Sequence, residues 1–308
     1  MGEAKMVCRD KTVLENQNLL VEINAWGSEL ARIYDKTHDR EVIWEGDPKI
    51  WNRHAPILFP FIGKSYENQY RFQGKTYSIT SHGFARDKEF ALVSRTENEV
   101  WYQLESSPET IEVYPFPFIL MAGHRLEGRT LKVMWKVKNT GDTPMYFMIG
   151  GHPAFKTPKG CTVHDFTLDF HCAGKKDALH YQSPNGDGYQ DEALSGSLAL
   201  EEGKVPVTPG FFSKVLTYIF DEGQVEKVSL LLPGGEPYVT VRCAGIPYLG
   251  VWTVEATHPF ICLEPWYGLC ASDGCDRDGW QGELTDRDGV VKLAAGQEFQ
   301  AEYEIEIH

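Results

Sequence analysis

The chain has 308 residues, of which 42% are apolar and 24% charged, a composition typical of a globular protein with a sizeable core. The formal net charge of −14 argues against nucleic acid and anionic membranes as partners, because no basic run offsets repulsion from phosphates. No segment approaches the roughly eighteen apolar residues of a membrane span, and the start lacks the apolar stretch of a signal peptide, so we expect a cytoplasmic protein.

Short runs of alternating apolar and polar residues, broken by turn residues, recur along the chain. The stretch YRFQGKTYSI (70–79) is typical of a hairpin around Gly74, and TLKVMWKVKN (130–139) alternates throughout. A turn at NTGDTP follows, and then the apolar run MYFMI (145–149). Each run predicts a strand, because successive side chains of a strand point to opposite faces of a sheet.

The segment around 174–213 is the least strand-like part, with turn residues concentrated in SPNGDGYQDEALSGS. Similar strand patterns follow it, namely EKVSLLL (226–232), YVTVRC (238–243) and EFQAEYEIEI (298–307). We therefore interpret the segment as a loop-rich surface excursion with room for a short helix. We find no long helical period and no internal repeat. The chain predicts an all-β fold, a large antiparallel β-sandwich that spans 1–308 as one domain.

The first polar interruption of this pattern is TSHGFARD, residues 80 to 87. Gly83 permits a close backbone approach or an unusual φ beside His82, and Arg86 follows shortly. One interpretation places His82 and Arg86 at a cleft. The alternative is a loop histidine on the surface.

The second interruption is GGHPAF, which begins at Gly150. Pro153 restricts His152 to extended conformations, and Gly150 and Gly151 remove side chains beside the imidazole, so we expect space for a ligand there. A group that transfers protons needs such a fixed position. The alternative is a histidine that caps the end of a sheet by hydrogen bonds.

The third interruption is PFICLEPWYG, residues 259 to 268, where Glu264 ends an apolar run. Desolvation of a carboxyl group at such a position raises its pKa toward neutrality. The alternative is a structural ion pair, for which Arg86 is a candidate partner. Trp252 and Trp266 would supply aromatic faces near the same edge.

Two histidines and a glutamate fit two kinds of chemistry. Metal sites of this type usually show a close His-x-Asp/Glu pair, which is absent here, and the seven cysteines form no C-x-x-C pair. General acid–base catalysis on a neutral polyol needs groups that titrate near working pH, which an imidazole and a desolvated carboxyl group satisfy. We therefore predict acid–base chemistry with no metal and no cofactor, and reduced cysteines.

Four motifs in order, HAPILFPFIGK, HGFARD, GGHPAFKTP and YLGVWT…PFICLEPWYG, resemble the aldose 1-epimerase (mutarotase) family, and its bacterial LacX-like branch most closely. The resemblance runs from about residue 13 to residue 307. It implies a galactose mutarotase-like sandwich with an open sugar-binding cleft and metal-free exchange of α- and β-anomers. It also implies that Glu264 is the general base, that His152 is the general acid at the ring oxygen, and that His82 is a second histidine near that oxygen.

The resemblance extends to residues that would hold the sugar. Lys64 stands where relatives more often have arginine, and Arg86 belongs to the motif of the branch. The family has a further acidic sugar-binding residue that no motif marks here, and Asp221 is our candidate. Trp252 and Trp266 would pack against the C–H face of the sugar.

Three other functions stay open from the sequence. A hexose-6-phosphate 1-epimerase would need a cationic patch, for which Lys64, Arg53 and Arg86 are the candidates. A sugar-binding protein without turnover would keep the fold, although His82, His152 and Glu264 argue against it. A metal-dependent sugar-modifying enzyme is the third. In each case we expect a small sugar as the partner of a monomer or homodimer.

Overall fold

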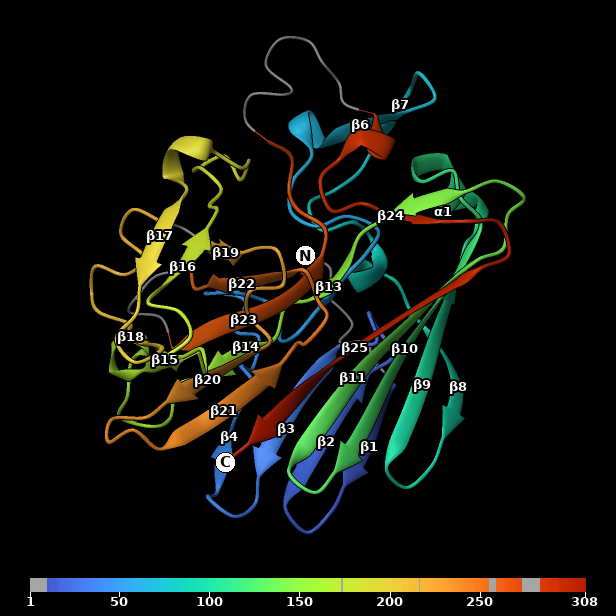
Figure 1. Cartoon of the computed structure of the whole chain (residues 1–308). Coiled ribbons are helices and arrows are strands. Elements are labelled where there is room, and N and C mark those ends of the chain that lie inside the picture. The colour runs from blue at the N-terminus through green and yellow to red at the C-terminus, as the bar shows by residue number, and fades with distance from the viewer. Residues whose placement is uncertain (1–9, 173, 216, 255–258, 273–282) are drawn as a thin grey trace, which may run out of the picture.

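The computed structural model of the chain describes residues 10–172, 174–215, 217–254, 259–272 and 283–308. Its regular structure is almost entirely antiparallel β-sheet, which confirms the predicted all-β class (Figure 1). In the described part of the chain the α-helical element is α1 (Pro108–Val113), a single turn and a half. No helix in these ranges has the length and apolarity needed to cross a membrane.

The largest sheet contains nine strands of the described chain. These are β8 (Ala91–Arg95), β9 (Glu99–Glu105), β10 (Phe118–Glu127), β11 (Thr130–Asn139), β15 (Thr167–Asp169), β18 (Lys204–Pro206), β20 (Lys227–Leu231), β21 (Pro237–Arg242) and β25 (Glu298–Ile307). They pair in the order β18-β15-β20-β21-β25-β11-β10-β9-β8. The strands predicted at 130–139 and 298–307 coincide with β11 and β25, which lie side by side with β10 (Figure 1).

A second sheet, near the N-terminal end of the described chain, packs against this one. It consists of β1 (Lys11–Glu15), β2 (Leu19–Asn24), β3 (Leu30–Asp35) and β4 (Arg40–Glu41), in that order. Val21 and Ile23 of β2 share one continuous apolar core with Val133 and Trp135 of β11, all four at most 2% exposed. The alternation seen in the sequence therefore places these residues in the space between sheets.

A third sheet carries the residues that the sequence singles out for chemistry. Its strands are β5 (Ile57–Leu58), β13 (Ile149–Gly151), β14 (Ala154–Lys156), β19 (Thr217–Phe220), β22 (Tyr248–Trp252) and β23 (Phe260–Tyr267). The order is β19-β22-β23-β13-β5, and β14 also pairs with β23. Leu263 of β23 and Tyr303 of β25 belong to the same core cluster, so this sheet packs against the nine-stranded one.

Short hairpins and 3-10 turns complete the described structure. The hairpins are β6 (Gln69–Phe72) with β7 (Lys75–Ser78), β12 (Met145–Phe147) with β24 (Val291–Leu293), and β16 (Ala178–Tyr181) with β17 (Gly196–Ala199). The 3-10 turns are Tyr66–Asn68, Ala85–Asp87, Val163–Asp165, Glu192–Leu194 and Leu284–Asp286.

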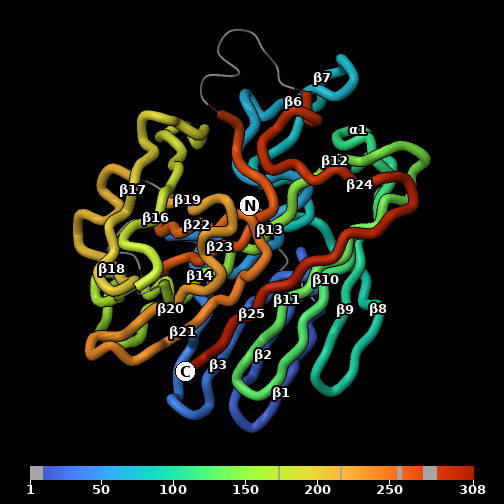
Figure 2. The backbone as a smooth tube through the Cα atoms, viewed as in Figure 1, coloured from blue at the N-terminus to red at the C-terminus, as the bar shows by residue number. Residues whose placement is uncertain are grey.

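The excursion predicted around 174–213 contains the β16–β17 hairpin, one 3-10 turn and β18, which joins the edge of the nine-stranded sheet. In Figure 2 the hairpin stands beside β19, and a backbone bridge between Gln182 and Ile219 connects the two. The excursion is therefore attached to the sheet that carries the candidate site. The single-domain organisation of the whole chain stays a prediction.

The turn after β7 needs glycine at position 83. Gly83 has a φ of +71°, and a Cβ atom there would lie 2.2 Å from the carbonyl oxygen of Phe59. That same oxygen accepts hydrogen bonds from the backbone N–H groups of Phe84 and Ala85. The sequence correctly predicts close approach and unusual φ at this glycine, which fixes the backbone on which His82 stands.

We predict that Gly83→Ala lowers the free energy of unfolding by roughly 2–4 kcal/mol, since it adds a steric clash to left-handed strain. The matched control is Gly74→Ala, because Gly74 has a φ of +74° but its added Cβ would lie 4.0 Å from the nearest atom. Chemical denaturation of both variants measures the difference. Equal losses in the two variants would mean that the contact with Phe59 contributes nothing.

Candidate active site

A cavity of about 290 Å³ opens over the sheet that contains β23 and β13. Seven of the eight predicted site residues line it: Lys64, His82, Arg86, His152, Trp252, Glu264 and Trp266. They come from segments that are far apart in the sequence. The volume is at the small end for ligand sites and suits a single sugar ring rather than a long polymer.

Asp221 is the predicted site residue that is not among those lining the cavity. It follows β19, and its carboxylate accepts hydrogen bonds from Gln182 Nε2 at 2.7 Å and Gln224 Nε2 at 3.0 Å. Thr217 and Ile219 of β19 line the cavity instead. The assignment of Asp221 to sugar binding stays a prediction, without support from the shape of the cavity.

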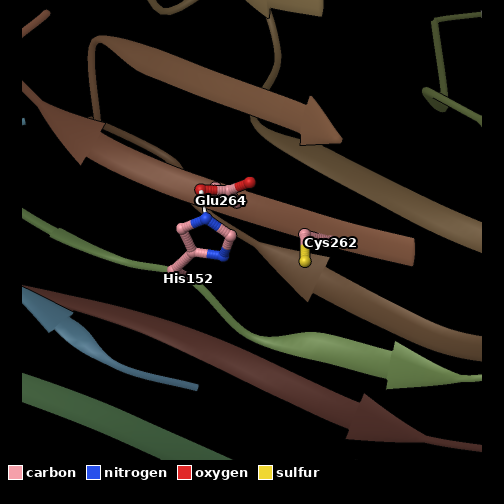
Figure 3. Close-up of side chains that lie close together, drawn as sticks. All are labelled: His152, Cys262 and Glu264. Carbon is pink, nitrogen blue, oxygen red and sulfur yellow. Dashed lines mark ion pairs between the residues drawn. The ribbon is translucent and has the colours of Figure 1, made fainter. Parts of the chain in front are cut away.

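Two of the lining side chains, His152 and Glu264, form a close pair (Figure 3). His152 Nε2 lies 3.1 Å from Glu264 Oε2, and the two side chains are 8% and 1% exposed. Glu264 comes from the middle of β23, and His152 from the connection between β13 and β14. The partner of Glu264 is thus His152 and not Arg86, the partner considered in the structural alternative.

Burial shifts the two pKa values of this pair in opposite directions. Desolvation raises the pKa of Glu264 well above its usual value. The nearby Trp266 indole N–H acts in the opposite direction, although it is not aligned into a hydrogen bond. Desolvation, with the charge of Arg86 as the second cause, lowers the pKa of His152 to about 3. Both shifts favour the uncharged forms, so the structure favours a pair without net charge, in which the shared titratable proton is on the carboxyl group of Glu264.

Aromatic rings fix the imidazole of His152 on several sides. The ring of Trp51 stacks on it at 5.0 Å between centroids, and Trp252 meets it edge-on at 5.3 Å. The carbonyl oxygen of Trp51 accepts a hydrogen bond of 2.8 Å from Trp44 Nε1, which holds the stacking residue in place. Sequence reasoning missed Trp51, which lies in the connection between β4 and β5 outside any alternating run.

Gly150 and Gly151 do not leave space for a ligand, which corrects the expectation from the sequence. A Cβ atom at Gly150 would lie 2.4 Å from the Trp266 indole, and one at Gly151 would lie 2.6 Å from the hydroxyl of Tyr303. Larger protein side chains already occupy the space that the two glycines vacate. The glycines act by allowing β13 to pack closely against β23 and β25.

His82 is fixed in one tautomer by the backbone of Gly63. The imidazole Nδ1 of His82 accepts a hydrogen bond of 3.2 Å from the backbone N–H of Gly63, and the backbone N–H of His82 donates to the carbonyl oxygen of Gly63 at 2.9 Å. An imidazole that accepts at Nδ1 carries its proton at Nε2 when neutral. Burial, and next the charge of Arg86, lower the pKa of His82 well below the usual value. His82 is therefore a neutral donor whose ring lies 5.7 Å from that of His152.

Two cationic side chains lie on the His82 side of the cavity. Arg86 Nη2 donates to the carbonyl of Ser81 at 2.7 Å, and burial lowers the Arg86 pKa to about 10. Lys64 Nζ donates to the carbonyl of Asp187 at 2.7 Å. Arg53, the third cation considered from the sequence, is outside the lining, and its guanidinium binds the carbonyl of Arg86 and the carboxylate of Asp87.

Comparison with known proteins identifies the family. The family model for aldose 1-epimerase matches residues 10–186 of the chain. The chain belongs to the aldose 1-epimerase family. Two LacX proteins of Lactococcus lactis, one chromosomal and one plasmid-encoded, are each 31% identical over 277 residues, which is 84% of this chain and 88% of theirs.

Solved structures agree with the family assignment. A galactose mutarotase related enzyme from Lactobacillus acidophilus superposes with a TM-score of 0.87 at 30% identity, covering 97% of both chains. A galactose mutarotase-like protein from Lactobacillus casei gives 0.85 at 28% identity, covering 97% of this chain and all of the other. These findings confirm the resemblance seen in the motifs and the sandwich fold, and they make the protein an isomerase of the mutarotase type.

One group of side chains in this aldose 1-epimerase has the composition of a metal site. The ligand atoms of His152, Cys262 and Glu264 lie within 4.8 Å of one another, and all three side chains are buried (Figure 3). Burial raises the pKa of the Cys262 thiol well above its usual value, as it does for Glu264. A divalent ion would have to displace both protons. The group therefore suits proton transfer better than metal binding.

We predict that Glu264→Gln stabilises the protein more at pH 8 than at pH 5. The folded-state pKa of Glu264 is above its unfolded value, so its contribution to stability is lost as pH rises through the folded pKa. Glutamine does not titrate. The difference in unfolding free energy between the variant and the unmodified protein should therefore grow from pH 5 to pH 8 by at least about 1.4 kcal/mol, the equivalent of one pKa unit.

Chemical denaturation at the two pH values measures this change. Glu97→Gln is the control, because Glu97 is exposed and outside the cavity. A stability difference for Glu264→Gln that is the same at both pH values would contradict the raised pKa.

Proposed function

We propose that the protein interconverts the α- and β-anomers of an aldopyranose, with Glu264 as the general base and His152 as the general acid. The observation that carries the proposal is the 3.1 Å approach of the two groups inside a sugar-sized cavity. The anomeric carbon bears both the hydroxyl that loses a proton and the ring oxygen that gains one. An acid and a base that serve two oxygens on one carbon must be neighbours.

The reaction conserves atoms and protons. Glu264 takes the proton of the C1 hydroxyl while His152 delivers a proton to the ring oxygen, and the bond from C1 to the ring oxygen breaks. The open-chain aldehyde forms, and rotation about C1–C2 turns its other face to the C5 hydroxyl. Closure reverses both transfers, so the C5 hydroxyl returns its proton to His152 and Glu264 protonates the new C1 hydroxyl.

The titratable proton that His152 and Glu264 share in the absence of a bound sugar supports this scheme. Transfer of that proton from the carboxyl group of Glu264 to His152 gives a carboxylate and an imidazolium without any exchange with solvent. Bound sugar oxygens stabilise that charged form because each accepts or donates a hydrogen bond to one member of the pair. The fixed Nε2–H of His82 would steady the charge that develops on the ring oxygen.

We expect Glu264→Gln and His152→Asn each to lose about 10²–10⁴-fold in the catalysed rate, the usual contribution of one proton-transfer partner. Anomer exchange of freshly dissolved α-glucose or α-galactose, followed by polarimetry or NMR, measures the loss. His180→Asn is the control, because His180 is exposed on β16 and outside the cavity lining. Full activity in either folded site variant would end the assignment, and tight binding without exchange would favour a sugar-binding protein.

We also predict a broad pH optimum without an inflection near 6.5, the ordinary range of histidine. The pair takes a second proton only as pH falls toward the His152 pKa of about 3, and loses its last proton only above the raised pKa of Glu264. The measurement is kcat/KM against pH after subtraction of the uncatalysed rate. An acid limb centred between about 6 and 7 would show that a histidine titrates normally in the working enzyme.

A further inference from the structure

Glu29 is a buried acidic side chain that has no part in the proposed chemistry. It stands in the turn between β2 and β3, is 5% exposed, and is not among the residues that line the cavity. Gly27 and Ser28 precede it with φ values of +72° and +44°, and after this tight turn the carboxylate reaches the connection between β4 and β5. Burial of a carboxylate is costly unless hydrogen bonds replace the lost water, so its partners indicate its role.

The partners of the Glu29 carboxylate are in residues 54 and 55. Oε1 accepts hydrogen bonds from the backbone N–H groups of His54 at 2.7 Å and of Ala55 at 3.2 Å. Oε2 lies 3.4 Å from Nδ1 of the His54 imidazole. Hydrogen bonds to a carboxylate are stronger than those between neutral groups. One side chain therefore fixes a segment that has no regular secondary structure of its own.

The same segment holds the backbone of His152 through its carbonyl groups. The N–H of His152 donates to the carbonyl oxygen of Pro56 at 3.1 Å, and the N–H of Ala154 donates to that of His54 at 3.0 Å. Residues 54–56 therefore connect Glu29 to the proposed general acid by hydrogen bonds on both sides. A shift of this segment would change the 3.1 Å approach of His152 Nε2 to Glu264 Oε2.

A second path runs through an aromatic ring of the cavity. Trp51 precedes His54 by three residues in the same connection, and its ring stacks on the His152 imidazole at 5.0 Å between centroids. The Glu29 carboxylate thus fixes one end of a short stretch whose other end contacts the imidazole. The two paths meet at His152, one at its main chain and one at its side chain.

We propose that Glu29 is a positioning residue for His152: through residues 51–56 it holds the imidazole where proton transfer with Glu264 can occur. The inference rests on the proposed function for the role of His152. Catalysis depends steeply on geometry, and a misplacement of about 1 Å can cost about 10²-fold in rate. A carboxylate that only stabilised the fold would change stability and leave the rate per folded molecule unchanged.

The alternative is an effect of the charge of Glu29 on Arg86. Burial lowers the Arg86 pKa to about 10, and the charge of Glu29 is among the smaller effects that oppose this decrease. Two conservative variants separate charge from position. Glu29→Gln removes the charge but keeps an oxygen that can accept both N–H groups. Glu29→Asp keeps the charge but draws the oxygens back by one methylene group.

The test measures kcat and KM for anomer exchange of glucose and galactose by NMR in three variants of Glu29. We expect Glu29→Ala to lower kcat by at least about tenfold with a smaller change in KM, because the loss falls on proton transfer. Glu29→Gln should stay within about threefold of the unmodified protein, since its hydrogen bonds are weaker but in place. The kcat of Glu29→Asp should lie between those of the other two variants.

Asp35→Asn is the matched control. Asp35 is fully buried in the same N-terminal sheet, where its carboxylate accepts hydrogen bonds from Arg40 at 3.2 Å and Arg129 at 2.8 Å. It is not among the residues that line the cavity. The variant weakens a buried carboxylate network without altering the partners of residues 54–56, so kcat should stay unchanged.

A spectroscopic measurement makes the test independent of turnover. NMR of protein with ¹⁵N in its histidine rings reports the tautomer and environment of His152, and His152→Asn assigns the signals. Glu29→Ala should shift the signals of the His152 ring, and Asp35→Asn should not. Thermal melting identifies a variant that fails to fold. If Glu29→Ala fails, the higher kcat of Glu29→Gln relative to Glu29→Asp provides the result.

The outcomes separate this inference from the proposed function. An unchanged kcat in folded Glu29→Ala, or an equal loss in Asp35→Asn, overturns the positioning role and keeps the epimerase. A Glu29→Gln variant slower than Glu29→Asp assigns the effect to charge and also overturns it. No acceleration of either sugar by the unmodified protein overturns the proposed function instead. In that case shifted His152 signals in Glu29→Ala still support the connection from Glu29 to His152, and unshifted signals overturn it.

Discussion

The carboxyl group of Glu264 is buried in the middle of β23, where it would be costly as a lone charge, and the imidazole of His152 lies 3.1 Å away. The rest of the site depends on this approach. Burial favours the protonated carboxyl group and the neutral imidazole, so the order of proton affinity of the two groups is the reverse of the order of their ordinary pKa values.

The fold brings these groups together by close packing between sheets. Gly150 and Gly151 let β13 approach Trp266 and Tyr303, and the chain then turns at once to present His152. Gly83, with its positive φ against the carbonyl of Phe59, does the same for the segment that carries His82. In both places glycine is required because a neighbouring side chain or carbonyl group occupies the position of a Cβ atom, and the titratable side chain stands on the segment that the contact fixes.

Much of this could be predicted from the sequence, and the remainder has physical reasons for being hidden. The alternation of apolar and polar residues in β11 and β25 could be recognised because each strand buries one face. The motifs around His82, His152 and Glu264 indicated the family. Trp51 could not be found, because its stacking on His152 depends on a connection without a periodic pattern. The volume beside a glycine likewise depends on which distant side chain enters it, and no local pattern reports that.

In the proposed mechanism, the fixed tautomer of His82 and the proton shared by Glu264 and His152 would make the site independent of the direction of the reaction. A two-base isomerase that passes a proton across its substrate ends each turnover with its bases in swapped states and must reset before it can act again. In the proposed mechanism ring opening and ring closure are mirror steps, so Glu264 and His152 would finish as they started whichever anomer entered. His82 would stay in one tautomer, because its Nδ1 accepts a hydrogen bond from Gly63. A catalyst of this kind would carry no memory of the anomer it last released, and its turnover would need no exchange of protons with bulk water.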